Sequence, residues 1–161
     1  MSHHVRDLIA HTELRSRLLS GAEGLDREVR WAHVCELPDP TEWLGEGDVL
    51  MTTGLGIPAD PLQQREYVQR LAEAGLAGMM IGEHMQAPAN LHALCERAEQ
   101  MNFPVILTEY GVPFAAVTRA IIDANQKEEY QRRNALVRVY ESARLSMSGL
   151  SLAGLVLRLE A

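Results

Sequence analysis

The sequence predicts an α/β domain with a small, mostly parallel sheet, flanking helices and an N-terminal hairpin, followed by a long C-terminal helix. Three short apolar runs, Val49–Met51, Ala77–Ile81 and Pro104–Leu107, have the length and composition of buried strands. Segments with helical periodicity lie between them, and this alternation is typical of right-handed parallel crossovers. After Pro113 the pattern becomes one long helical run.

The N-terminal part of the chain predicts a short helix and two strands. Val5–Ala10 places its apolar side chains at helical spacing. Leu18–Leu19 then enters a glycine-rich turn at Gly21–Gly24, and Val29–Glu36 returns as an extended segment. We expect these two strands to pair with each other as the hairpin.

A corner bounded by prolines follows the second strand. Pro38 and Pro40 bracket Asp39, which ends the strand and fixes a rigid turn. Thr41–Leu44 has the length of one helical turn, with Thr41 as the predicted N-cap. Aromatic side chains beside a strand and a short helix are most often core, so Trp31 and Trp43 are predicted to be buried. The alternative is that they line a pocket and stack on a flat ligand.

Two amphipathic helices are predicted between the apolar strands. Asp60 caps the first, Pro61 occupies its first position and Gly75 ends it. The second extends from Pro88 to Met101 and stops at Asn102. We expect the first helix to bury Leu62, Tyr67, Val68, Leu71 and Ala72, and to expose Gln63, Gln64, Arg65, Glu66 and Arg70. The second is expected to bury Leu91, Leu94, Cys95, Ala98 and Met101.

The residue composition changes in the C-terminal part of the chain. Residues 125–134 are almost wholly polar, no proline or glycine interrupts the run before Gly149, and apolar positions return at Leu136 and Val137. This pattern predicts a helix that leaves the domain and either crosses solvent or pairs with a second copy, which would give a homodimer. We therefore divide the chain into an α/β domain at 1–124, a linker helix at 125–148 and the start of a further helical segment at 149–161, and expect the natural protein to be longer.

Composition limits the class of protein. Hydrophobic content of 47% and charged content of 23% describe a globular protein, and no apolar run is long enough to span a membrane. The formal net charge of −7 argues against binding a phosphate backbone, which needs a concentrated basic face. With two distant cysteines and no apolar signal core at the N-terminus, we expect reduced thiols and a cytoplasmic protein.

Polar side chains and glycines gather where the Val49–Met51 strand ends. Thr52 and Thr53 offer hydroxyls there, and Gly54 and Gly56 expose backbone N–H groups. In open α/β sheets, ligands bind at the carboxyl ends of strands. The alternative is that the threonines satisfy the loop backbone and that Gly54 only supplies a positive φ.

Two acids flank the neighbouring corner. Glu36 and Asp39 carry acceptors for the N–H or ammonium groups of a ligand. Asp39 has an alternative role as an Asx-turn or helix cap, and Glu36 as a partner in a structural ion pair. Glu109 and Tyr110 are expected at the same sheet edge. The candidate ligand-binding residues are Glu36, Asp39, Thr52, Thr53, Gly54 and Gly56.

Signatures of catalysis and metal binding are missing from the sequence. Gly54-Leu-Gly56 lacks the third glycine of a dinucleotide fingerprint, and there is no Gly-Lys-Ser/Thr phosphate loop. His33 and Cys35 share one face of a strand, but no other spacing completes a zinc set. No serine or cysteine lies in a nucleophile motif. We therefore expect no enzyme, no cofactor and no metal.

Five separated motifs occur in a fixed order along the chain. They are GAEGLDREVRW at residues 21–31, ELPDP at 36–40, GDVL at 47–50, TTGLG at 52–56 and FPVI at 103–106. Together they resemble the N-terminal sensory domain of the purine catabolism regulator (PucR-type) family of bacterial transcription factors. The GDVL strand also resembles the N-terminal domain of Mur ligases, a likeness that bears on fold alone.

The family resemblance implies a C-terminal helix-turn-helix module and effectors from nitrogen catabolism, such as purine breakdown products or amino acids. The leading hypothesis is therefore a small-molecule sensor, with DNA bound only by a region absent from this chain. The first alternative is a dimerisation or scaffold module without a ligand. A third, an accessory domain of a ligase-like enzyme, rests only on the Mur likeness.

Overall fold

The computed structural model describes residues 3–147, and its centre is a five-stranded sheet in the order β1-β5-β4-β3-β2. Four strands run parallel and β1 pairs antiparallel with β5, so the predicted α/β fold with a mostly parallel sheet is confirmed. The strands are β1 Ser16–Ser20, β2 Trp31–Val34, β3 Asp48–Thr52, β4 Gly78–Gly82 and β5 Val105–Thr108.

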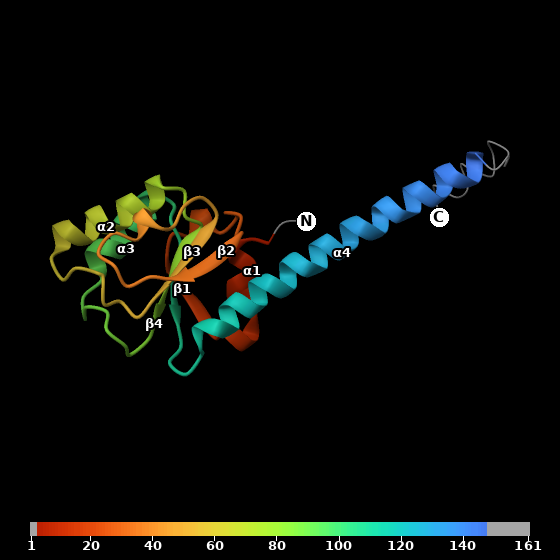
Figure 1. The fold of residues 1–161 in the computed structure, drawn as a ribbon. Coiled ribbons are helices and arrows are strands. Elements are labelled where there is room, and N and C mark those ends of the chain that lie inside the picture. The colour runs from red at the N-terminus through yellow and green to blue at the C-terminus, as the bar shows by residue number, and fades with distance from the viewer. Residues whose placement is uncertain (1–2, 148–161) are drawn as a thin grey trace. The chain divides into compact units, whose positions relative to one another are not determined.

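Helices cover both faces of the sheet (Figure 1). One face packs against α2 and α3, with Leu50 and Met79 facing that side, and the other packs against α1 and the first turns of α4 through Val49 and Met80. The helices are α1 Val5–Ala10, α2 Pro61–Glu73, α3 His92–Gln100 and α4 Phe114–Met147, with single 3₁₀ turns at η1 Thr12–Leu14, η2 Ala22–Gly24 and η3 Pro40–Glu42.

The predicted N-terminal hairpin is wrong, because β1 and β2 lie at opposite edges of the sheet. The segment between them crosses the amino ends of β4 and β5, where the Arg27 guanidinium donates to the carbonyl oxygens of Leu76, Met101 and Asn102 at 3.1, 3.3 and 3.0 Å. These bonds hold the segment away from the position that it would need to form a hairpin between β1 and β2. Burial lowers the pKa of Arg27.

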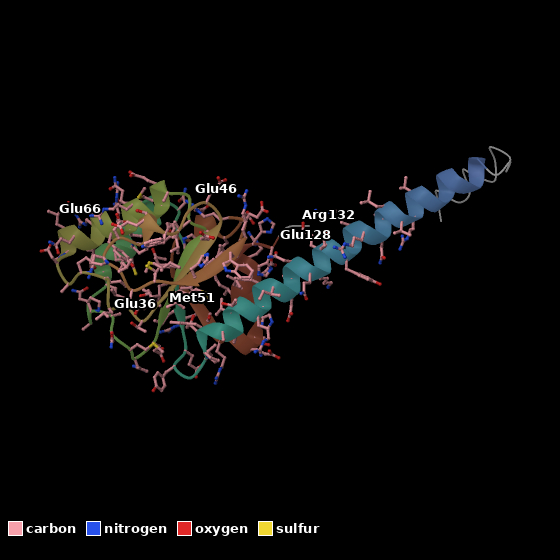
Figure 2. The ribbon with its side chains drawn as sticks, in the orientation of Figure 1. Glu36, Glu46, Met51, Glu66, Glu128 and Arg132 are labelled. Atoms are coloured by element: carbon pink, nitrogen blue, oxygen red, sulfur yellow. The ribbon has the colours of Figure 1, made fainter. Side chains whose placement is uncertain are left out.

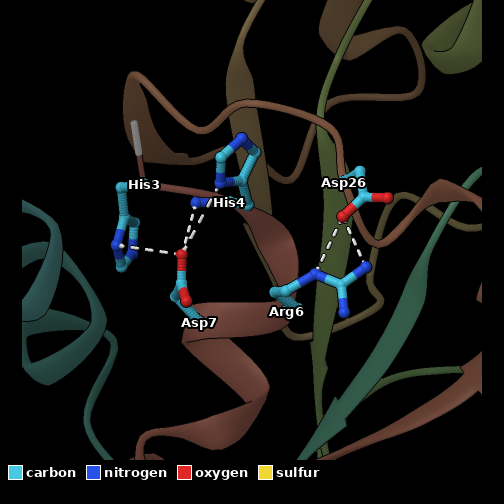
Figure 3. A network of polar contacts seen from close by, with 5 residues as sticks. All are labelled: His3, His4, Arg6, Asp7 and Asp26. Atoms are coloured by element: carbon cyan, nitrogen blue, oxygen red, sulfur yellow. Dashed lines mark hydrogen bonds and ion pairs between the residues drawn. The ribbon is translucent and has the colours of Figure 1, made fainter. Parts of the chain in front are cut away.

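Polar contacts fix the N-terminus beside this crossing segment (Figure 3). The backbone N–H of His4 donates to Asp7 at 2.8 Å, which closes a capping box on α1. The guanidinium of Arg6 binds the carboxylate of Asp26 through two nitrogens. The short helix α1 is thereby tied to the segment that precedes β2.

Helix α2 begins as predicted but buries a different stripe. Asp60 accepts from the Gln63 N–H at 3.0 Å and Pro61 occupies the first position. Leu62 is 65% exposed and Gln64 is buried, against expectation, while Tyr67, Val68 and Leu71 are buried as expected. The core stripe therefore starts at 64, and its first member is polar because Gln64 joins two loops: its amide nitrogen donates to the carbonyl oxygens of Pro58 and Asn90.

Helix α3 begins at His92, four residues later than the predicted Pro88. The side chain of Asn90 accepts from the His92 N–H at 2.9 Å, and the Gln64 side chain accepts from the Leu94 N–H at 3.2 Å. These contacts keep residues 88–91 in a loop. The helix ends as predicted, with Asn102 at a φ of +53°.

The described residues fall into two compact units that divide between Asp123 and Ala124, within α4. In the first unit, Val117 and Ile121 are fully buried. In the second, α4 carries ion pairs such as Glu128 with Arg132 at 3.8 Å, both labelled in Figure 2. The predicted break at Ser148–Gly149 and the helix predicted from Leu150 lie outside the described residues.

Candidate functional site

A hydrogen-bond network joins the carboxyl ends of β2 and β3. The Glu36 carboxylate accepts from the hydroxyls of Thr52 and Thr53 and from the Thr53 N–H at 2.9 Å. The Thr52 hydroxyl in turn accepts from the Gly54 N–H at 2.9 Å. The structure therefore brings these four residues together, and their polar groups bind one another.

The two glycines of the loop after β3 allow close backbone contacts. Gly54 has a φ of +97°, and a Cβ there would lie 2.4 Å from the Cα of Ala87. A Cβ on Gly56 would lie 2.6 Å from the carbonyl oxygen of Leu37. The loop after β3 therefore packs closely against both the Glu36 corner and the loop after β4.

Asp39 is outside this network and caps η3. Its carboxylate accepts from the Thr41 N–H at 3.1 Å and from the Thr41 hydroxyl, which lowers the pKa of Asp39. The predicted N-cap at Thr41 is therefore wrong by two residues, because the aspartate reaches the free N–H groups of the turn.

Both tryptophans were predicted to be buried, and the structure contradicts this. Trp43 is 76% exposed on η3 and Trp31 is 38% exposed on the edge strand β2. The core below the corner is closed instead by smaller side chains, such as Leu44 and Cys35, because the short turn lies at the rim of the sheet.

A cavity of about 270 Å³ lies beside the corner, between α2 and the loops that follow β2 and β3. Of the predicted site residues, only Gly56 lines it. Four positions of α2, spaced as one helical stripe, form a wall. The lining residues are Pro38, Gly56, Pro58, Gln63, Glu66, Tyr67 and Arg70.

Sequence reasoning placed the α2 residues of this wall either in the core or in solvent. Tyr67 is 2% exposed, and burial raises the pKa of its hydroxyl, with further contributions from Cys35, Glu36 and Asp39. Arg70 lies 3.9 Å from Glu66. The signal that would have found this wall is polar residues at i, i+3 and i+7 on a helix that begins just after a glycine-rich loop.

A second cavity, of about 250 Å³, lies at the ends of β4 and β5. It is lined in part by Glu109, which was expected at the sheet edge of the candidate site. It contains an exposed ion pair, Arg15 with Glu109 at 3.7 Å, and a partly exposed one, Arg17 with Glu83 at 3.8 Å. Exposed pairs of this kind contribute little stability.

Residues 3–147 offer no metal centre and no membrane-spanning helix. In that range the structure contains no group of three His, Cys, Asp or Glu side chains that would hold a metal ion. His33 lies 3.9 Å from Asp48, and Cys35 is buried in the core. No helix of the described residues has the length and apolarity needed to cross a membrane.

Comparison with known proteins identifies the family. The model of the purine catabolism regulatory protein-like family matches residues 7–124, well over half of the chain. The chain belongs to this family. The match covers the sheet, the Glu36 network, the cavity and the first turns of α4.

Two curated relatives are transcription regulators. The chain is 42% identical over 137 residues to the transcriptional activator PmfR of Paenarthrobacter nicotinovorans, an alignment that covers 85% of this chain and 29% of PmfR. It is 28% identical over 91 residues to the purine catabolism regulatory protein of Bacillus subtilis (strain 168), covering 56% of this chain and 17% of that protein. The chain thus spans less than a third of either relative, and these relatives are regulators rather than enzymes, as expected.

Proposed function

We propose that the chain is the small-molecule-sensing domain of a cytoplasmic bacterial transcription regulator of purine or amino-acid catabolism. The observation that carries this proposal is the cavity at the carboxyl edge of the sheet, where α/β sheets bind ligands. Glu36, Asp39, Thr52, Thr53, Gly54 and Gly56 hold the two loops beside it. Their role in binding is to fix the loops on which the effector rests.

Strand β3 offers a route from the effector to α4. Thr52 belongs to the Glu36 network, while its neighbour Met51 belongs to the core cluster of Val117 and Ile121, on the opposite face of the sheet. A shift of β3 would therefore change the packing beneath the start of α4. Such coupling requires the effector to prefer one of two arrangements of that helix.

DNA binding is assigned to another part of the regulator. The net charge of −7 disfavours contact with a phosphate backbone, and the chain spans only a fraction of its regulator relatives. Sequence-specific DNA binding by residues 1–161 alone would contradict this division.

A thermal-shift screen of the 161-residue chain tests the sensor. The panel contains purines, ureides and amino acids, because a ligand at about 100 times its Kd adds roughly 2.7 kcal/mol to the free energy of unfolding. We expect at least one compound to stabilise the chain and Glu36→Gln to reduce that shift. Glu109→Gln, which changes an exposed carboxylate at the other cavity, is the matched control. A folded chain that no compound stabilises would contradict the sensor.

The second candidate function is dimerisation through α4. The observation that favours it is a set of exposed apolar side chains in the second unit: Tyr130, Leu136, Val137 and Val139. Tyr130 and Val137 are seven residues apart and therefore lie on one side of the helix, and a coiled coil would remove that side from water. We expect the molecular mass in sedimentation equilibrium to rise with concentration toward a dimer, and Tyr130→Glu with Val137→Glu to restore a monomer. A wild-type chain that stays monomeric at high concentration would exclude this function.

A further inference from the structure

Strand β2 lies at one edge of the sheet and has a free side. Within residues 3–147, β3 is the only strand that pairs with it. The N–H of Cys35, which directly follows β2, donates to the Met51 carbonyl oxygen at 3.1 Å and therefore points toward β3. Successive residues of a strand direct their backbone N–H and C=O groups to opposite sides, so those of Ala32 and Val34 point toward the free edge. Strand β2 thus presents donors and acceptors with which another strand could pair.

The two edges of the sheet differ in how they are protected. At the β1 edge, a bulge between Leu18 and Ser20 breaks the register, and the charged side chain of Arg17 is 67% exposed. Bulges and charges commonly keep edge strands from pairing with other chains. Strand β2 has neither, because its register with β3 is unbroken from Trp31 to Val34 and none of its residues is proline, lysine or arginine. The β2 edge is therefore open to the addition of a strand.

Apolar side chains flank this edge on both faces of the sheet. Cys35 belongs to the core cluster on the α2 and α3 face, and Ala32 to the cluster on the α1 face. By alternation, Trp31 lies on the first of these faces and Val34 on the second. Trp31 is 38% exposed and Val34 is 54% exposed. A strand added to β2 would remove part of both side chains from water, which favours association.

The distribution of charge around β2 favours a second copy of this chain as the source of the added strand. Two of the three charged residues at 27–30, before β2, are arginines, whereas the three at 36–42, after it, are all acids: Glu36, Asp39 and Glu42. Two β2 strands related by a two-fold axis are antiparallel. The basic end of each strand then lies beside the acidic end of the other, and both contacts are attractive. With Ala32 opposite Val34 of the other copy, each outward N–H of these residues faces an outward carbonyl oxygen.

We propose that two copies of the chain associate through their β2 strands, which pair antiparallel and join the two sheets into one. The inference goes beyond both proposed functions, because the contact lies in the first unit and requires neither an effector nor α4. Strand β2 has only 4 residues, so the contact is small and the dimer that it forms by itself is weak.

Amide hydrogen exchange of the whole chain, followed by NMR from about 50 μM to about 1 mM, tests the pairing directly. The chain carries Tyr130→Glu and Val137→Glu, so that association through α4 does not contribute. We expect exchange of the Val34 amide to slow about tenfold when about nine-tenths of the chain is paired, because only the free form exchanges. The Cys35 amide, bonded to Met51 within each copy, is the internal reference. A Val34 amide that exchanges equally fast at every concentration would overturn the proposal.

Two substitutions at Val34 should remove the pairing and leave the core intact. Val34→Pro deletes the outward N–H, and proline is tolerated on an edge strand where that N–H would face solvent. Val34→Lys places a charge at the edge. In the same α4 background, the molecular mass in sedimentation equilibrium should rise with concentration for the parent chain and stay that of a monomer for both variants. Leu62→Lys, at an apolar α2 residue that is 65% exposed, is the matched control and should associate as the parent chain does.

The outcomes separate this inference from the proposed functions. Either Val34 variant, if folded by circular dichroism and still associating like the parent chain, would overturn the β2 contact. If Val34→Pro does not fold, Val34→Lys and the exchange of the parent chain decide. A parent chain that stays monomeric at about 1 mM would also overturn the contact. In that case, association of the wild-type chain would still support dimerisation through α4, and a hit in the thermal-shift screen would still support the sensor.

Discussion

Single side chains close the corner at the ends of β2 and β3. Glu36 satisfies both threonine hydroxyls and one backbone N–H, so both of its carboxylate oxygens are engaged within the protein. The sequence analysis placed Glu36, Thr52 and Thr53 in one candidate ligand site, and the parallel pairing of β2 with β3 brings them together. Their mutual saturation was not predictable, since it depends on side-chain rotamers.

Glu36→Ala should lower the free energy of unfolding by about 2 kcal/mol, because it leaves three donors without their acceptor. Urea denaturation followed by circular dichroism measures this. The matched Glu109→Ala, at a carboxylate with one long exposed ion pair, should change it by less than about 0.5 kcal/mol. Equal effects of the two substitutions would contradict the role assigned to Glu36.

Gly54→Ala should also destabilise the chain, by more than about 1 kcal/mol. Its φ is +97° and the new Cβ would overlap Ala87. Gly45→Ala is the control and should be nearly neutral, because a methyl group at Gly45 would meet nothing within 4 Å and the φ of Gly45 is not positive. The measurement is the difference in melting temperature between the Gly54→Ala and Gly45→Ala chains.

His3 makes stability depend on pH. Burial lowers the pKa of His3 below its ordinary value of 6.5, so the unfolded chain binds the proton more readily. The contribution of His3 is present above pH 6.5 and is lost as the pH falls through its folded-state pKa. We expect His3→Gln to flatten the decline of stability between pH 7 and about pH 5, measured by urea titration at each pH. An unchanged decline would show that other groups cause it.

At the scale of elements, α2 connects the core to the site. Its inner face carries Gln64, which holds the loops before α2 and α3, and its outer stripe forms the cavity wall. The start of α2 was predictable from Asp60 and Pro61, since capping is local. The polar member of its buried stripe was not, because glutamine in a helix is normally solvated.

Gln64→Ala should lower the free energy of unfolding by about 2 kcal/mol, because two carbonyl oxygens and the Leu94 N–H lose their partner. The neighbouring Gln63→Ala removes an exposed side chain and should change stability by less than about 0.5 kcal/mol. Chemical denaturation of both variants provides the comparison. A Gln64→Ala chain as stable as Gln63→Ala would contradict the bridging role.

Local signals predicted the five strands and the order of the helices, whereas strand pairing was predicted less well. The hairpin prediction failed because β1 pairs with β5, some 90 residues further along the chain, through the register Ser16 with Thr108. An arginine is normally expected to be exposed, but Arg27 holds the crossing segment in place. Long-range pairing depends on such contacts, which no local pattern reveals.

At the scale of the whole molecule, the chain combines a packed α/β unit with a second unit that contains most of α4. Its membership of the purine catabolism regulatory protein-like family was predictable from separated motifs, since several of them lie in the corner and loops around the Glu36 network. The cavity was not predictable, because the α2 side chains of its wall were expected either in the core or in solvent. The proposed division into 1–124, 125–148 and 149–161 stays a prediction.

In the proposed function, a small molecule bound at the sheet edge changes DNA binding by the regulator. The most direct measurement is the affinity of a full-length regulator carrying this domain for its operator DNA, with and without the compound that stabilises the domain. We expect the affinity to change by about 5- to 150-fold, the range of ordinary allosteric coupling. Equal affinities at saturating compound would contradict it.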